Sequence, residues 1–455
     1  MSNKSLLLIL LTVSIATHFA FFGNPNQTVF DEVHFGKFIS GYYTHQYYFD
    51  IHPPLGKLII AGFGKLFDFK PDPPAGEAGF NFAEIGEKFP DAKYLSLRFL
   101  PALAGTLLPI VIFFLALELG FSRRGAFLAG MLIALDNALV TQSRFILLDS
   151  FLLLFGFSAL WCYFRYRTSA LQAKSYKLQA FWLAAMGILG GMAASIKWTG
   201  LTFLALAGIV ELARVAKARA FRTIPSLTVP FIVIPLALYF SVFAVHFALL
   251  TKSGPGDAFM SQQFQKTLAG SSASARTDIR GSTPLEKFVE LNIEMYRSNQ
   301  RLTATHPYGS PWYSWPFMQR PIFYWVDGGA RVYLLGNPLI WWLSTAAVLL
   351  VALGYLLRKI PVDHIGVFLL TGYALNLLPF VGIQRVMFLY HYFTAFIFAV
   401  LLLAYVLEQR IKKDRAWLAV IALAVLFFAY FAPLTYGLPL TPNQYQARLW
   451  MRSWE

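Results

Sequence analysis

The apolar run SLLLILLTVSIATHFAFF (5–22) decides the fold class, because it is almost long enough to cross a bilayer by itself. It holds about 18 residues, close to the ~20 that a membrane-spanning helix needs. Lys4 precedes it, and no clear small-x-small cleavage site follows. We therefore expect an uncleaved first membrane helix rather than a signal peptide.

The composition extends this reading to the whole chain. Of 455 residues, 57% are hydrophobic and 13% are charged, whereas soluble globular proteins carry roughly 25% charged residues. The net charge of +15 does not indicate nucleic-acid binding, since the basic residues stand in short clusters between apolar runs, as topology signals do. Cys162 is the only cysteine, which excludes an intramolecular disulfide and a cysteine metal cage.

Apolar segments of spanning length recur along the chain, and no internal repeat accompanies them. We therefore predict an all-α polytopic membrane protein, a single domain over 1–455 with about 11 transmembrane helices. The predicted helices lie near 5–22, 95–117, 126–142, 146–164, 180–196, 199–213, 225–250, 337–357, 364–382, 386–408 and 416–434.

The Lys and Arg residues predict the orientation. With a cytoplasmic N-terminus, seventeen of them fall in the inner segments, and the short outer turns hold only Arg144, Lys197 and Arg385. This bias follows the positive-inside rule and marks those three cations as unusual. Two long loops, 23–94 and 251–335, then lie on the outer face, where loops of this length usually carry function.

The two long loops have distinct contents. In the first, FKPDPPAGEAG (69–79) is typical of a flexible turn. In the second, the segment 284–302 predicts an amphipathic helix at the membrane interface, with Leu285, Phe288 and Met295 on its apolar face. Eight aromatics and four prolines follow within 306–325, which indicates a rigid surface at headgroup depth.

The first loop opens on DEVHFGKFISGYYTHQYYFDIHPPLGK (31–57), which is dense in ionisable side chains. Charge beside a bilayer is costly and usually functional. Few carboxylates beside many cations suit an anionic lipid headgroup, above all a phosphate. The outer-face candidates are Asp31, Glu32, His34, Asp50, His52, Lys57, Arg98, Arg144, Asp149, Lys197, His306, Arg320, Arg385 and His391.

Structural roles remain open for several of these residues. Arg98 or Lys197 can snorkel to the interface, the latter beside Trp198. Arg144 and Asp149 can pair with each other and stabilise their turn. The HPP tripeptide that contains His52 can serve as a stiff turn.

The motif DEVHFGKF…FDIHPPLGKL (31–58) resembles the first-loop signature of the protein O-mannosyltransferase family, within the GT-C superfamily of lipid-phosphosugar-dependent glycosyltransferases. Further pieces occur in family order and extend the resemblance over 31–393. They are LRFLPALAGTL, SRFILLDSFLLLF, SIKWTGL, THPYGSPWYSWPFMQRPIFYW and FLYHYF.

The resemblance implies a GT-C fold, a polyprenyl-phosphate mannose donor, a Ser or Thr acceptor hydroxyl, inversion at the sugar carbon, and neither metal nor cofactor. Asp31 matches the family's acidic position, proposed as the base, and Glu32 its neighbour, which helps to place the acceptor. Arg98 matches the arginine expected to hold the donor phosphate. We further expect Arg144, Lys197, Arg385 and His391 at the phosphate, and Asp50, His52, His306, Trp312 and Arg320 at the acceptor or sugar.

The chemistry of such a transfer agrees with this set of residues. A hydroxyl is a poor nucleophile and needs a positioned base. A phosphate leaves as an anion, so it needs cations rather than the second carboxylic acid of a glycosidase. One carboxylate with several cations is therefore sufficient.

The sequence departs from the family pattern in two places. Loop 251–335 has 85 residues, too few for the β-trefoil domain of eukaryotic members, so the chain resembles the short prokaryotic form. Thr394 stands where the resemblance leads us to expect proline. We expect the chain in the cell membrane, with its active site outside, binding polyprenyl-phosphate mannose and protein acceptors rather than nucleic acid, either alone or as a dimer.

Two other functions compete with this hypothesis. One is a glycosyltransferase that uses the same kind of donor but acts on a lipid or glycan. The other is a secondary transporter, but transporters place their polar groups at the bilayer midplane and often show internal repeats. Here the charges cluster at the outer rim of the predicted bundle.

Overall fold

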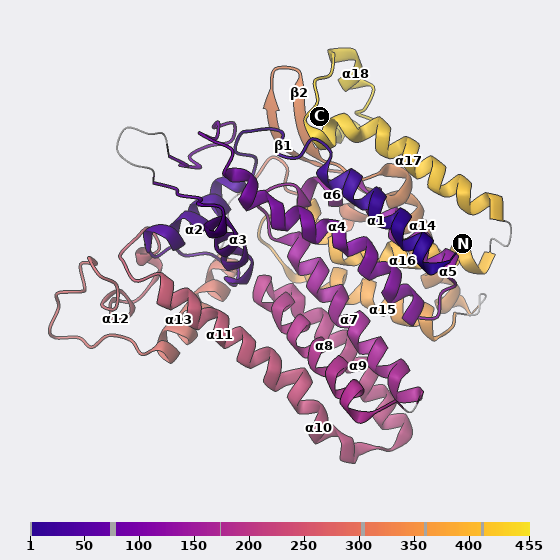
Figure 1. Ribbon diagram of the computed structural model, residues 1–455, viewed down its shortest axis with the longest axis horizontal. Coiled ribbons are helices and arrows are strands. Elements are labelled where there is room, and N and C mark those ends of the chain that lie inside the picture. The colour runs from indigo at the N-terminus through magenta and orange to yellow at the C-terminus, as the bar shows by residue number, and fades with distance from the viewer. Residues whose placement is uncertain (1, 73–78, 173, 302–304, 359–361, 411–413) are drawn as a thin grey trace.

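The computed structural model describes residues 2–72, 79–172, 174–301, 305–358, 362–410 and 414–455. It is a helical bundle with two groups of shorter elements at its edge (Figure 1). Most of the predicted turn at 69–79 lies outside the described residues, as do the inner cations Lys359, Lys412 and Lys413.

All eleven apolar segments form helices. The bundle consists of α1 (Asn3–Phe19), α4 (Tyr94–Glu118), α5 (Arg123–Ala134), α6 (Asn137–Ser143), α7 (Asp149–Leu171), α8 (Tyr176–Ile196), α9 (Leu201–Ala218), α10 (Ile224–Thr228), α11 (Ile234–Leu249), α14 (Pro338–Leu357), α15 (His364–Leu377), α16 (Phe393–Arg410) and α17 (Asp414–Tyr436). Short 3-10 or π turns extend several of them, among them η1 (Trp198–Gly200), η6 (Leu378–Gly382) and η7 (Leu389–Tyr392).

The number of spanning helices differs from the expected 11. Within the described residues, eight helices are long and apolar enough to cross a membrane, or nine if the bent pair α5–α6 is one span. Helix α1 has 17 residues, and α7 contains charged residues, Asp149 in its first turn and Arg165 and Arg167 farther along. The chain is a multi-span membrane protein, and the count of 11 is not confirmed.

The bend between α5 and α6 has a local cause. The two helices meet at 60°, and the side chain of Asp136 caps α6 by accepting the backbone N–H of Leu139 at 3.0 Å. The same carboxylate accepts the N–H of Asn337 at 2.9 Å and the indole N–H of Trp341 at 2.8 Å. This buried carboxylate therefore fastens the break to the start of α14.

The two long loops are largely ordered. The first contains α2 (Glu32–Thr44) and α3 (Leu55–Leu66); the second contains α12 (Gln262–Gln265), α13 (Pro284–Arg301), η5 (Trp312–Phe317) and the antiparallel strands β1 (Ile322–Asp327) and β2 (Ala330–Leu334). Helices α2, α3, α12 and α13 gather on one side of the bundle, the left in Figure 1. The hairpin β1–β2 is the exception to the all-α prediction, and α18 (Pro442–Gln446) follows the last bundle helix.

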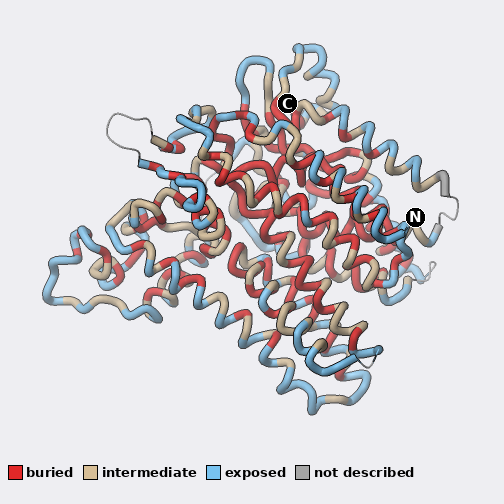
Figure 2. The backbone as a smooth tube through the Cα atoms, viewed as in Figure 1, coloured by how far each residue is buried: buried red, intermediate tan, exposed pale blue. Residues whose placement is uncertain are grey.

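Helix α13 confirms the predicted helix, although its buried face differs from the prediction. Leu291 and Met295 are buried, but Leu285 is 60% exposed and Lys287 takes a place on the buried side. Lys287 is tolerated there because its ammonium lies over the rings of Phe247 and Phe264. Figure 2 shows the buried residues concentrated in the centre of the bundle, while α13 and the loops at that side are mixed.

Candidate active site

A cavity of about 540 Å³ lies where the bundle meets α13. The rest of its wall comes from the start of α7, the turn between α8 and α9, the end of α15 and the segment that leads into α16. Its polar lining comprises His52, Asp149, Lys197, Thr199, Thr202, Asn299, Gln300, Asn376, Gln384, Arg385, Tyr390, His391 and Thr394. This volume falls within the range of small-molecule sites.

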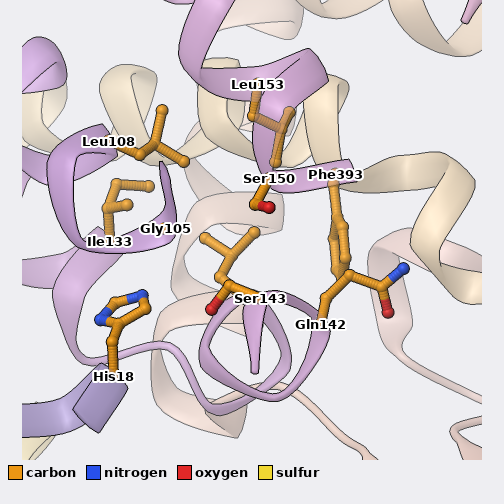
Figure 3. A pocket seen from close by; sticks show the side chains of 10 residues that line it. His18, Gly105, Leu108, Ile133, Gln142, Ser143, Ser150, Leu153 and Phe393 are labelled. Carbon is orange, nitrogen blue, oxygen red and sulfur yellow. The ribbon is translucent and has the colours of Figure 1, made fainter. Parts of the chain in front are cut away.

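A second void lies inside the bundle between His18, Gly105 and Ile133 on one side and Gln142 and Phe393 on the other (Figure 3). Its volume is about 10 Å³, which is the space of about one water molecule. The void is therefore too small for a substrate, and we take the larger cavity as the site.

Lys197 enters the cavity from a tight turn. It ends α8 in an extended conformation, and a Cβ on Gly200 would lie 2.3 Å from the backbone of Ala193, so only glycine fits this turn. The Lys197 Nζ donates to Oδ1 of Asp149 at 2.7 Å and lies 5.1 Å from the centre of the Tyr390 ring. The ammonium is thus fixed at the cavity wall by one carboxylate and one aromatic face.

Arg385 and His391 come from the segment that joins η6 to η7. Arg385 lines the cavity, has no hydrogen-bonding or ion-pair partner among the described residues, and has its pKa lowered by burial. The Nδ1 of His391 lies 3.1 Å from the backbone N and 3.0 Å from the backbone O of Phe388. The His391 ring stacks on Trp315 at 5.9 Å. Its Nε2 is therefore left for the cavity.

Asp31 does not itself line the cavity, but its charge interacts with those of Lys197 and Asp149, which do. It is the N-cap residue of α2 but makes no capping hydrogen bond, and its carboxylate has no hydrogen-bond donor within the described ranges. Burial raises the pKa of Asp31 to about 7, with the charges of Asp149 and Asp50 adding to the rise and Lys197 opposing it. A carboxylate that gains and loses its proton near neutral pH suits general-base chemistry.

The next residue, Glu32, forms a closed ion pair. Both of its oxygens accept from Arg98, Oε1 from Nε at 2.8 Å and Oε2 from Nη2 at 2.6 Å. The backbone N–H groups of Val29 and Ile146 donate to the same carboxylate at 2.9 and 2.8 Å. Glu32 is 0% exposed, so it joins the first loop to α4 and to the turn before α7 and does not reach a substrate.

Arg98 likewise forms its hydrogen bonds with other groups of the protein. Besides Glu32, its guanidinium donates to the backbone carbonyls of Gly23, Pro25 and Gln27, and it is 0% exposed. All the guanidinium nitrogens are engaged, and Arg98 does not line the cavity. In this structure no N–H group of Arg98 remains for a ligand, and its role at the donor phosphate stays a prediction.

Arg144 was also expected at a phosphate, or paired with Asp149. Instead its guanidinium donates to the carbonyls of His18, Ala20 and Phe21 at 2.6–2.8 Å and lies over the Tyr436 ring. It thereby satisfies the carbonyls at the C-terminal end of α1. The expected pairing of Arg144 with Asp149 is wrong, because the partner of Asp149 is Lys197. The expected contact of Arg144 with a phosphate stays a prediction.

Asp50 and His52 stand two positions apart in one motif and line the same small void, but only His52 also lines the main cavity. The Asp50 carboxylate pairs with the ammonium of Lys57 and faces a void of about 10 Å³ rather than the main cavity. His52 lines the main cavity. Burial lowers the pKa of His52 well below its usual value, and Lys197, Lys57 and Arg385 add to this, so the ring is a neutral hydrogen-bonding group.

The three candidates of the second loop lie outside the cavity. The guanidinium of Arg320 donates to the carbonyls of Pro307 and Ser453, which ties the loop to the end of the chain. Trp312 contacts the ring of Tyr313 and no other described ring. His306 is exposed, with its ring near Phe30 and Phe388. Like Trp312 and His306, Arg320 and Asp50 do not line the cavity, and the sugar or acceptor role of these four residues stays a prediction.

For some residues near the cavity, the sequence alone predicts no specific role. Asp149 was named as an outer-face candidate or as a partner of Arg144, without a specific role. Trp315, three residues after Trp312, does not line the cavity but stacks on the His391 ring. The amides Asn299 and Gln300 stand at the end of α13 and were given no role. The sequence feature that could have indicated a role for Asn299 and Gln300 is their position, as a pair of polar side chains at the end of a predicted amphipathic helix.

The described residues contain no group of three or more His, Cys, Asp or Glu side chains that could hold a metal ion. The sequence-based expectation of a reaction without metal or cofactor therefore stays a prediction. The cations that face the cavity are Lys197 and Arg385.

Comparison with known proteins completes the description of the chain. A family model described as dolichyl-phosphate-mannose-protein mannosyltransferase matches residues 8–251. A second model, the C-terminal four-transmembrane region of protein O-mannosyltransferase, matches residues 284–454.

Curated relatives share the first part of the chain. Dolichyl-phosphate-mannose–protein mannosyltransferase 4 of Candida albicans is 36% identical over 300 residues, 63% of this chain and 38% of the relative. Protein O-mannosyltransferase 1 of Drosophila pseudoobscura is 35% identical over 275 residues, 58% of this chain and 29% of the relative. The aligned part thus spans about a third of the length of these relatives.

Solved structures share the fold. The protein O-mannosyltransferase complex of Saccharomyces cerevisiae bound to the sugar donor superposes with a TM-score of 0.91 at 22% identity, over 100% of this chain and 93% of that chain. ArnT from Cupriavidus metallidurans bound to undecaprenyl phosphate gives a TM-score of 0.56 at 15% identity, over 93% and 64% of the two chains. The expected GT-C fold is confirmed.

Proposed function

The chain belongs to the dolichyl-phosphate-mannose–protein mannosyltransferase family, the protein O-mannosyltransferases, and from this premise we propose that it is an inverting glycosyltransferase. It moves mannose from a polyprenyl-phosphate carrier to Ser or Thr hydroxyls of proteins. The observation that carries the proposal is the unpartnered carboxylate of Asp31 beside a cavity whose cations are Lys197 and Arg385.

Asp31 acts as the general base. Its carboxylate is not tied up by α2 or by an arginine, unlike that of Glu32. With a pKa of about 7, it accepts the hydroxyl proton as the oxygen attacks the sugar carbon. The bond from that carbon to the phosphate oxygen breaks on the opposite face, and the electron pair leaves with the phosphate. A single displacement of this kind inverts the sugar carbon.

Lys197 and Arg385 receive the phosphate. Lys197 uses one of its N–H groups on Asp149 and Arg385 uses none on the described residues, so both have donors to offer. Cationic donors at the leaving oxygen stabilise the charge that develops there. His391 adds a ring nitrogen at the same wall, and His52 offers a hydrogen bond to the sugar hydroxyls.

The location and assembly belong to the same proposal. We place the reaction on the outer face of the cell membrane, with the N-terminus inside, because the Lys and Arg residues of the short loops favour that orientation. The yeast structure is a complex of two such proteins, which supports a dimer for this chain.

Transfer of label tests the proposal. Membranes that carry the protein are incubated with labelled polyprenyl-phosphate mannose and a Ser/Thr-rich peptide, in the presence of a chelator. We expect label on the peptide, and a loss of about 10²- to 10⁴-fold for Asp31→Asn, the contribution of a positioned base.

Asp68→Asn is the matched control. Asp68 lies in the same loop, is exposed and pairs with Lys70 at the surface, so its loss leaves transfer unchanged. Label that appears only in lipid extracts would instead make the acceptor a lipid. Full activity of Asp31→Asn would remove Asp31 as the base.

A further inference from the structure

A chain of hydrogen bonds joins the hairpin β1–β2 to the cavity. The Tyr324 hydroxyl donates to Oε1 of Gln142 at 2.5 Å. The Gln142 Nε2 donates to Oδ2 of Asp149 at 2.7 Å, and Oδ1 of Asp149 accepts from Lys197 at 2.7 Å. The four residues come from β1, α6, α7 and the end of α8, so the chain connects elements far apart in the sequence.

In this series of hydrogen bonds, the donors and acceptors can be arranged in one way only. Tyr324, Gln142 and Asp149 are 0%, 3% and 6% exposed, so water does not compete for their groups. If the Gln142 amide turned over, its oxygen would face the Asp149 carboxylate and its NH₂ would face the Tyr324 O–H. Because the Tyr324 O–H needs an acceptor, its donation holds the Gln142 NH₂ toward Asp149.

The Gln142 bond determines how Lys197 is held. Since one Asp149 oxygen is occupied by Gln142, Lys197 pairs with the other oxygen alone. The remaining N–H groups of the ammonium are then free to face the cavity that Lys197 lines. Without Gln142, both oxygens of Asp149 compete for Lys197 and draw it away from a ligand.

Tyr324 also supports the residue before Asp31. Its carbonyl accepts the backbone N–H of Phe30 at 3.2 Å, and its ring stacks on the Phe30 ring at 4.3 Å between centroids. Phe30 has a φ of +43°, in the left-handed region that a phenylalanine rarely adopts, so it needs such support. The ring and backbone of Tyr324 therefore act on Asp31, while its hydroxyl acts on Lys197.

We propose that Tyr324 and Gln142 are positioning residues that couple the two halves of the site: through Gln142 and Asp149 the Tyr324 hydroxyl holds Lys197 toward the donor phosphate, and through Phe30 the Tyr324 ring holds Asp31. This assignment rests on the proposed function for its choice of ligand. It gives the hairpin β1–β2 a role in donor binding although neither strand lines the cavity.

The test measures binding and turnover separately. Equilibrium binding of labelled polyprenyl phosphate to the detergent-solubilised full chain gives a Kd that does not depend on transfer. We expect Tyr324→Phe and Gln142→Met each to raise this Kd about three- to tenfold, as the loss of one buried hydrogen bond predicts. The double variant binds no more weakly than either single variant, because both changes break one chain.

Phe30→Leu probes the other branch. It removes the stacked ring but keeps the Tyr324 hydroxyl, so we expect the kcat for peptide to fall while the Kd for polyprenyl phosphate stays unchanged. Tyr324→Phe gives the opposite pattern, with a raised donor KM and an unchanged acceptor KM. A purely structural role would move all of these values together with the unfolding temperature.

Tyr333→Phe is the matched control, since Tyr333 is a buried tyrosine of the same hairpin whose hydroxyl bonds to that of Tyr445. It leaves the Kd unchanged. A wild-type Kd for polyprenyl phosphate in Tyr324→Phe and Gln142→Met would overturn the inference. Absence of peptide labelling by the unaltered protein would overturn the proposed function instead. The binding test of the hydrogen-bond series would still be valid.

Discussion

Two buried ion pairs of this protein, Glu32–Arg98 and Asp149–Lys197, differ in what they leave unused. Arg98 donates to one carboxylate and three carbonyls and has no exposed surface. Lys197 donates to one carboxylate, and its side chain retains 12% exposure at the wall of a cavity. Only the second pair has hydrogen-bond donors left for a ligand, so the two pairs serve stability and binding respectively.

The largest effect on the comparison of the two ion pairs is expected when Arg98 is replaced. Replacing it with Met leaves the Glu32 carboxylate buried without its partner, which costs about 3–5 kcal/mol of folding free energy. We expect a large fall in the unfolding temperature of Arg98→Met in detergent, with donor binding lost together with the fold. A variant that remains stable but no longer binds polyprenyl phosphate would return Arg98 to the phosphate site.

At Lys197 the opposite pattern is expected. Lys197→Met removes a cation from the leaving phosphate, and transfer to peptide falls about 10²- to 10³-fold, as for the loss of one donor at a developing charge. The unfolding temperature falls less than for Arg98→Met, because the Asp149 carboxylate faces the cavity, unlike that of Glu32, and remains bonded to Gln142. A fall in stability equal to that of Arg98→Met would make the two pairs equivalent.

The pH dependence of the reaction tests the role of the Asp149–Lys197 pair. Since the base must be ionised, we expect kcat/KM to fall as the pH drops below about 7, the value to which burial raises the pKa of Asp31. The charge of Lys197 opposes this rise in the pKa of Asp31. Removing Lys197 therefore raises the pKa of Asp31 further. The pH below which activity is lost is therefore expected to be higher for Lys197→Met than for the wild type. A pH–rate profile of the two proteins measures this shift directly.

The smallest effect is expected at Arg320, whose guanidinium holds the carbonyls of Pro307 and Ser453 outside the cavity. Arg320→Ala lowers the free energy of unfolding by about 1 kcal/mol, the worth of ordinary hydrogen bonds. The Kd for polyprenyl phosphate does not change. A weakened donor affinity in this variant would extend the site to the second loop.

Much of the fold was accessible from the sequence, because a bilayer forces each spanning segment to be long, apolar and helical. All eleven segments are helices, but averaging of hydropathy concealed the bend at Asp136. That bend depends on Asn337 and Trp341, about two hundred residues later. The hairpin β1–β2 was likewise hidden in a stretch read as an irregular aromatic surface.

The candidate site was predicted less completely. Lys197, Arg385, His391 and His52 were chosen as lone charged or polar groups at the outer rim, and all four line the cavity. Arg98 and Arg144 satisfied the same criterion, yet backbone carbonyls from other elements take up their donors. Sequence spacing does not reveal how many donors a cation has already committed, and this decides between a structural and a binding role.

The wall of the large cavity combines α13, which is not among the spanning helices, with residues of α9 and α15, which are. In the proposed orientation, a chamber walled by both kinds of helix lies at the boundary between hydrocarbon and water. Under the proposed function, an amphiphilic donor can slide its charged head into such a chamber by lateral diffusion within its leaflet, while a polypeptide acceptor arrives from the aqueous phase. Neither has to cross into the other's solvent for the two to meet.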